Sequence, residues 1–244
     1  MKWLNLPQVT KNLLIIKVLI FLAGILIPGM EQSLYKWAAL HYFSSPGFNV
    51  AQLFTYMFLH GNFTHLFFNM FALVMFGKII EQVMGSSRFL IFYISCGIFA
   101  ALCQLGINAI QVHQAAQMYS PQEYDYIVRE GWNNIINNYQ FVDPYAAHLN
   151  NLVNGATVGA SGAIYGILLA FGMFFPNQPI YLYMLFPIKA KWLVIGYGVI
   201  ELLSGMSTNG DGVAHFAHLG GMIAGLILIL YWRKKGFFRN RWFF

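Results

Sequence analysis

Six apolar runs, separated by short polar or glycine-containing stretches, most constrain how this chain can fold. They lie near residues 13–29, 65–84, 88–110, 157–175, 191–204 and 213–232. A helix that crosses hydrocarbon needs about 20 residues, so the fifth run must tilt or begin earlier, near Leu185. Only 9% of the residues are charged, against about 25% in soluble domains. The sequence therefore predicts an all-α fold, a polytopic six-helix transmembrane bundle.

Basic residues are sorted between the two sides of this bundle. With six spans both termini lie on one side, which collects twelve of the fourteen Lys and Arg residues: Lys2, Lys11, Lys17, Lys78, Arg88, Lys189, Lys191, Arg233, Lys234, Lys235, Arg239 and Arg241. The other side has only Lys36 and Arg129. Since Lys and Arg accumulate in cytoplasmic loops, we expect both termini in the cytoplasm. The net charge of +6 does not indicate nucleic-acid binding, because the basic residues flank apolar runs and do not line one soluble face.

The same pattern divides the chain into three parts. Residues 1–12 form a cytoplasmic N-terminus, residues 13–232 a six-span domain, and residues 233–244 a basic cytoplasmic tail. Within the domain, the polar stretch 111–156 is expected to form an extended outer loop insertion with short helical pieces. The aromatic outer stretch 30–64 is expected to lie partly in the membrane interface, and 204–212 to form a short flexible loop.

Polar side chains interrupt the even-numbered spans where they are costly in lipid. They are His65 and Asn69 in the second span, Ser161 and Tyr165 in the fourth, and His215 and His218 in the sixth. In the predicted topology each even-numbered span starts on the outer side. These groups therefore share one depth, a few residues below the outer surface.

Taken alone, Ser161 has a simple structural interpretation: a serine in a membrane helix commonly hydrogen-bonds to a carbonyl one turn earlier. Its flanking glycines, Gly159 and Gly162, favour a second interpretation, because they clear space for a substrate backbone or a close helix. A serine becomes a nucleophile when a histidine takes its proton. No acid is expected on the even-numbered spans at this depth, Glu201 at the end of the fifth span being nearest, so the sequence predicts a Ser–His dyad.

Two other functions fit parts of this pattern. His215 and His218, joined by His60 and His65, could bind a metal, but their spacing differs from His-Glu-x-x-His and the glutamate is missing. A proton-coupled transporter could use the histidines as a relay, but its polar groups should lie deeper, near paired interrupted helices.

The motifs together resemble the rhomboid family of intramembrane serine proteases. The resemblance rests on Gly159-Ala160-Ser161-Gly162, on Ala217-His218-Leu219-Gly220-Gly221, and on His60 followed by His65-x-x-x-Asn69. It covers most of the chain except 111–156 and the tail, and fits the six-span bacterial form. The Trp-Arg pair that many members have in the first outer loop is absent here, where the chain reads Gln52-Leu53-Phe54-Thr55.

The resemblance implies a role for each of these residues. Ser161 is the expected nucleophile and His218 the expected general base, with His65 and Asn69 stabilising the oxyanion. Tyr165 is expected to pack on the catalytic imidazole, and Gly221 and Gly225 to let two helices approach closely. No metal or organic cofactor is implied. The expected partners are the lipid bilayer and single-span membrane substrates cut near their outer ends, and the expected location is a bacterial inner (plasma) membrane. A non-catalytic, client-binding relative is the alternative.

Overall fold

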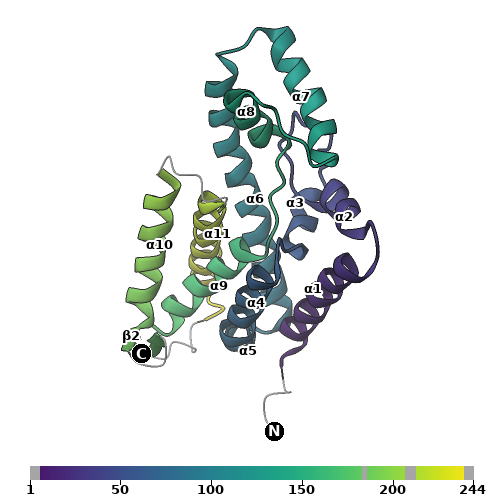
Figure 1. Cartoon of the computed structure of the whole chain (residues 1–244). Coiled ribbons are helices and arrows are strands. Elements are labelled where there is room, and N and C mark those ends of the chain that lie inside the picture. Colours follow the sequence, from purple (N-terminus) through teal and green to yellow (C-terminus); the bar gives the residue numbers. More distant parts are fainter. Residues whose placement is uncertain (1–5, 183–185, 207–212, 239–244) are drawn as a thin grey trace.

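The computed structural model describes residues 6–182, 186–206 and 213–238, and it is predominantly helical (Figure 1). An N-terminal helix, α1 (Gln8–Leu26), is followed by the short helices α2 (Met30–Ala38) and α3 (Gln52–Thr55). Helix α4 (Phe63–Ala72) continues through a π-helical turn, η3 (Leu73–Gly77), into α5 (Lys78–Met84). The remaining helices are α6 (Ser86–Ala116), α7 (Pro121–Ile136), α8 (Pro144–Asn154), α9 (Ser161–Phe174), α10 (Ala190–Met206) and α11 (His215–Lys234).

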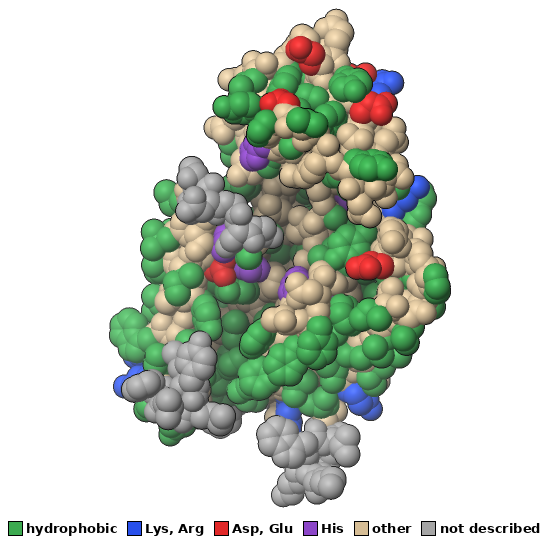
Figure 2. Space-filling model, viewed as in Figure 1, with side chains coloured by type: hydrophobic (Ala, Val, Ile, Leu, Met, Phe, Trp, Pro, Cys, Tyr) green, Lys and Arg blue, Asp and Glu red, His purple; other side chains and the backbone are tan. Residues whose placement is uncertain are grey.

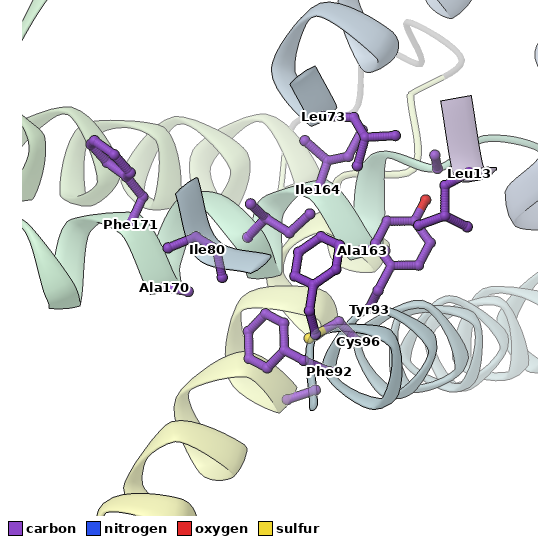
Figure 3. Packing of buried hydrophobic residues seen from close by; sticks show 14 of the residues in the cluster. Leu13, Leu73, Ile80, Phe92, Tyr93, Cys96, Ala163, Ile164, Ala170 and Phe171 are labelled. Carbon is purple, nitrogen blue, oxygen red and sulfur yellow. The ribbon is translucent and has the colours of Figure 1, made fainter. Parts of the chain in front are cut away.

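Helices α6, α9 and α11 pack against one another and form the centre of the molecule. Their contacts belong to one apolar core, which extends from Leu13 of α1 through Tyr93 of α6 to Ile164 of α9 (Figure 3). Small residues let these helices approach closely, which is how helices associate in lipid, where apolar burial supplies little drive. The core therefore holds α9 and α11 side by side.

Among the residues that the structure describes, four helical stretches are long and apolar enough to cross a membrane, judged by length and composition: Gln8–Leu26, Phe63–Met84, Ser86–Ala116 and His215–Lys234. Helix α9, with 14 residues, is a shorter apolar helix. On the side of the molecule drawn in Figure 2, hydrophobic side chains cover much of the lower part of the surface. An all-α polytopic bundle is thus confirmed, whereas the count of six spans stays a prediction.

Three boundaries differ from those expected. Helix α9 begins at Ser161 and not at residue 157, so Ser161 is the first residue of its helix. Helix α10 does not begin near Leu185, because a two-stranded antiparallel hairpin of β1 (Pro179–Leu182) and β2 (Phe186–Lys189) precedes it. Helix α6 runs six residues past 110, to Ala116. The expected loop 204–212 lies mostly outside the described residues, as do Lys2, Arg239 and Arg241.

The insertion 111–156 folds as α7 and α8 at the C-terminal end of α6 (Figure 1). Ser120 and Glu123 form a capping box at the start of α7, and the hydrogen bonds from Ser120 lower the pKa of Glu123. A small second core joins the two helices to the end of α6 and to Tyr42. The insertion is therefore a packed layer and not an extended loop.

Lys17 does not belong with the basic residues that the sequence assigned to the side of the termini. It lies in the middle of α1, fully buried, with Nζ 4.3 Å from the centre of the Phe58 ring and 5.0 Å from that of Tyr93. The basic bias becomes eleven residues against two when Lys17 is left out of the twelve. The excess of basic residues on one side, from which the orientation was predicted, therefore remains.

Candidate active site

The segment that leads into α9 is tied to the aromatic outer stretch by backbone hydrogen bonds. Leu40 and Thr157 exchange N–H···O bonds of 3.0 and 2.8 Å, and the Gly159 N–H donates to the Tyr56 carbonyl at 3.0 Å. Gly159 has a φ of +129°, which disfavours any other residue, and an added Cβ would lie 2.7 Å from the His65 ring. These contacts determine where the first turn of α9 begins.

Ser161 and His218 lie in direct contact at the N-terminal ends of α9 and α11. Ser161 Oγ is 2.7 Å from His218 Nε2, a hydrogen bond that joins residues 57 apart in the chain. Because Ser161 is the first residue of its helix, no helical turn precedes it for the back-bonding that a serine usually makes in a membrane helix. The hydroxyl is instead paired with an imidazole, the geometry that activates a nucleophile.

Beyond this contact, further along both helices, the backbones of α9 and α11 pack closely against each other. A Cβ added at Gly221 would lie 1.8 Å from the Gly162 carbonyl oxygen, so no side chain fits there. At Gly225, one turn further on, an added Cβ would meet Phe92 Cζ at 3.1 Å and Gly166 Cα at 3.3 Å. The separation of Ser161 and His218 therefore depends on glycine at position 221.

Tyr165, one turn after Ser161, stacks on the His218 imidazole. The ring centres are 4.3 Å apart and the planes differ by 8°. The Tyr165 hydroxyl donates a hydrogen bond to Glu201 Oε1. Tyr165 thus contacts the imidazole through its face and a carboxylate through its hydroxyl.

The sequence predicted a Ser–His dyad because the even-numbered spans have no acid at this depth, and it named Glu201, at the end of the fifth span, as the nearest acid. In the structure Glu201 lies beside the imidazole. Glu201 Oε2 lies 2.9 Å from His218 Nδ1 and 2.6 Å from His215 Nδ1. The former contact is within ion-pair distance, although it lacks the alignment of a hydrogen bond. Helices α10 and α11 run in succession and pack together, so the end of α10 reaches the depth at which α11 begins. The sequence places Glu201 at the end of the run that precedes His218, but it does not show that the two side chains meet.

His65 and Asn69 occupy the first turns of α4, on the other side of Gly159. The His65 ring lies against Gly159, which is also beside Ser161 Oγ. The Asn69 side chain is buried, and its amide donates to the His65 carbonyl at 2.8 Å. His60 packs edge-on against His65, with ring centres 5.2 Å apart. The structure therefore brings His65 to the serine and places Asn69 one turn further along α4.

Glu201, His215 and His218 are also the group whose ligand atoms could hold a metal ion, all within 4.8 Å of one another. A tetrahedral zinc ion about 2.0–2.2 Å from each ligand would keep the ligand atoms about 3.3 Å apart. The contacts of 2.6 and 2.9 Å are shorter than this. They fit a carboxylate paired directly with two imidazoles better than a metal centre.

Comparison with known proteins identifies one family. The Rhomboid domain matches residues 47–120 and 130–235, which include Ser161, His218, Glu201 and His65. The yeast protein "Rhomboid protein 1, mitochondrial" from Saccharomyces cerevisiae is 27% identical over 171 residues, or 70% of this chain. The chain spans 38% of the length of that relative. The unmatched residues 121–129 lie in α7.

Proposed function

The chain belongs to the rhomboid family, and on that premise we propose that it is an intramembrane serine endopeptidase that uses Ser161 and His218. Membership supports a protease-type hydrolase at the level of the family. One observation carries the assignment to these residues: the 2.7 Å contact between Ser161 Oγ and His218 Nε2. A serine and a histidine in contact, at the outer ends of two apolar helices, are the two groups that acyl transfer requires.

In the first half of the reaction, the Ser161 hydroxyl attacks a peptide carbonyl of the substrate. His218 Nε2 takes the hydroxyl proton while the new C–O bond forms, which gives a tetrahedral oxyanion and an imidazolium. The imidazolium then gives that proton to the leaving amine as the C–N bond breaks. The products of this half are an acyl-enzyme, in which the amino-terminal part of the substrate is an ester on Ser161, and a released carboxy-terminal fragment that has a new free amino group.

In the second half, water replaces the amine. His218 takes a proton from water as the oxygen attacks the acyl carbon, and returns a proton to Ser161 Oγ as the ester bond breaks. Figure 2 shows histidine and acidic side chains at a recess in the surface of the molecule. A site at the outer ends of α9 and α11 gives water a route that a site at mid-membrane would not have.

The oxyanion would be stabilised by donors around the start of α9. The first N–H groups of a helix have no partner within the helix and carry its positive dipole end. Here those groups begin at Ser161, and the His65 ring lies against the preceding Gly159. We assign His65 and the Ser161 N–H to the oxyanion, with Asn69 holding the first turn of α4 through the His65 carbonyl and offering its second amide proton. One such donor is worth about 3–4 kcal/mol in other hydrolases.

The proposed substrates are single-span membrane proteins cleaved near the outer face. A helix hides its carbonyls in its own hydrogen bonds, so the substrate must unwind locally before a carbonyl can reach Ser161. Access past α10 is supported by its place beside the site, where it packs against α9 and α11 and exposes Ile195, Val199 and Ile200. No cofactor takes part in this scheme.

The test is cleavage of a single-span substrate by protein reconstituted in lipid vesicles. Ser161→Ala and His218→Ala should reduce cleavage to background, a loss on the order of 10⁴-fold or more. Ser95→Ala, a serine within α6, is the matched control and should cleave normally. Cleavage that survives Ser161→Ala would refute the proposal. Wild-type protein that binds the substrate, but neither cuts it nor reacts with a fluorophosphonate, would indicate a client-binding relative.

We also propose that both termini face the cytoplasm, in a bacterial inner membrane. The support is the excess of basic residues on one side, eleven against two after Lys17 is left out of the twelve. Reporter fusions at each terminus and in the α7–α8 loop test it. Termini that report the outer side would contradict it and would place Ser161 at the inner face.

A further inference from the structure

We propose that Glu201 is a positioning residue for the reaction, which holds the His218 imidazole with its Nε2 directed at Ser161. The role rests on the proposed function, because it acts through His218. It adds to the Ser–His pair a carboxylate that α10 supplies. Glu201 contacts side chains of both α9 and α11, and these contacts support the role.

The carboxylate is placed on the far side of the imidazole from the nucleophile. Ser161 Oγ contacts Nε2 at 2.7 Å, and Glu201 Oε2 approaches Nδ1 to 2.9 Å. For Nε2 to accept the serine proton, Nδ1 must carry the ring hydrogen. The carboxylate oxygen at Nδ1 is an acceptor for that hydrogen, so it favours the tautomer that catalysis needs.

Glu201 is itself held at both oxygens. Oε1 accepts from the Tyr165 hydroxyl, and Oε2 lies 2.6 Å from His215 Nδ1. A carboxylate that is 5% exposed is costly to bury unless it is paired and hydrogen-bonded. Tyr165, His215 and His218 supply that pairing from two helices. The carboxylate is therefore a fixed point against which the imidazole is oriented.

The charge of Glu201 also fits the reaction. His218 becomes an imidazolium when it takes the proton of Ser161, and a carboxylate 2.9 Å away stabilises that cation. The groups that face the imidazole are Ser161 and Tyr165 from α9, His215 from its own helix, His65 from α4 and Glu201 from α10. Glu201 is the acid in this set of described residues.

A purely structural role is the competing explanation, in which Glu201 only ties α10 to α11. Glu81 provides a matched control for it. Its carboxylate is also buried, 2% exposed, and accepts hydrogen bonds from Val9 N, Thr10 N and Oγ1, and Ser86 Oγ. Loss of either carboxylate should affect stability, whereas loss of Glu201 alone should affect chemistry.

The experiment compares Glu201→Gln, Glu201→Asp, Glu81→Gln and Ser161→Ala in lipid vesicles, with kcat, KM, fluorophosphonate labelling rate and Tm measured for each. We expect Glu201→Gln to lower kcat and the labelling rate about 10- to 100-fold, with KM within about twofold. This is less than the 10²–10⁴-fold that a general base contributes, because the base itself is kept. Glu201→Asp should recover part of kcat, and Glu81→Gln should lower Tm while kcat is unchanged.

Three results would overturn the positioning role and leave the proposed function intact, since Ser161→Ala would still be inactive. They are an unchanged kcat in Glu201→Gln, a raised KM with kcat retained, and a fall in Tm without a slower labelling rate. Wild-type protein that neither cleaves nor labels would instead overturn the proposed function, and the positioning role with it.

Discussion

Replacing Gly221 with alanine should separate the nucleophile from its base. The new Cβ would lie 1.8 Å from the Gly162 carbonyl oxygen, whereas ordinary contact begins at 3.4 Å. The obstacle is backbone, which cannot rotate away, so α9 and α11 must move apart by up to 3.4 − 1.8 = 1.6 Å. Gly162 is adjacent to Ser161, and Gly221 is three residues after His218. The displacement of the two backbones should therefore move Ser161 Oγ away from His218 Nε2.

The size of the effect follows from the geometry. A 2.7 Å contact between Oγ and Nε2 widened by most of that displacement leaves the range of about 2.6–3.2 Å in which proton transfer is efficient. A misplacement of about 1 Å costs on the order of 10²-fold in rate. Overpacking should also destabilise the fold by about 1–3 kcal/mol. Gly225→Ala, where the clash is only a few tenths of an ångström, should lose several-fold at most.

Gly106→Ala is the matched control, because an added Cβ there meets nothing within 4 Å. It should be fully active and slightly more stable, since alanine favours a helix over glycine by about 1 kcal/mol. The assay is kcat/KM on a reconstituted substrate, with Tm and fluorophosphonate labelling to show that the variants fold. If folded Gly221→Ala cleaves within about threefold of Gly106→Ala, the link between backbone packing and catalytic geometry is refuted.

Two further predictions concern a buried lysine and the effect of a metal chelator. Lys17→Met should raise the free energy of unfolding by about 1 kcal/mol, because Lys17 Nζ is buried without a hydrogen-bond partner among the described residues. A lower Tm of the variant in detergent would contradict this. It would show that the contacts of Lys17 with Phe58 and Tyr93 outweigh the cost of desolvating its amino group. Treatment with EDTA should leave cleavage unchanged, because the Glu201 contacts are too short for a metal; loss of activity that zinc restores would contradict this.

Much of the architecture followed from local sequence. Lipid offers no partners to backbone N–H and C=O groups, so the apolar runs had to become helices. The runs 65–84 and 88–110 lie within the helices observed, and 213–232 lies within α11 except for its first two residues. The shared depth of Ser161 and His218 also followed from the sequence, because charge sorting predicted where each span begins. The insertion was predicted to contain helical pieces because 119–140 has an amphipathic pattern, and α7 lies within that range.

Other features depended on which helices are neighbours. Hydropathy does not specify how a helix rotates about its axis or which helix it packs against, so it could not show that Glu201 contacts His218. Nor could it place Lys17 in the interior against Phe58, or separate the hairpin 179–189 from the helix that follows it. By itself the sequence determined a membrane-embedded helical bundle with a serine and a histidine at one depth. Only the packing of α9, α10 and α11 decided that a carboxylate meets the imidazole from the other side, because that contact joins helices whose lateral arrangement no local pattern encodes.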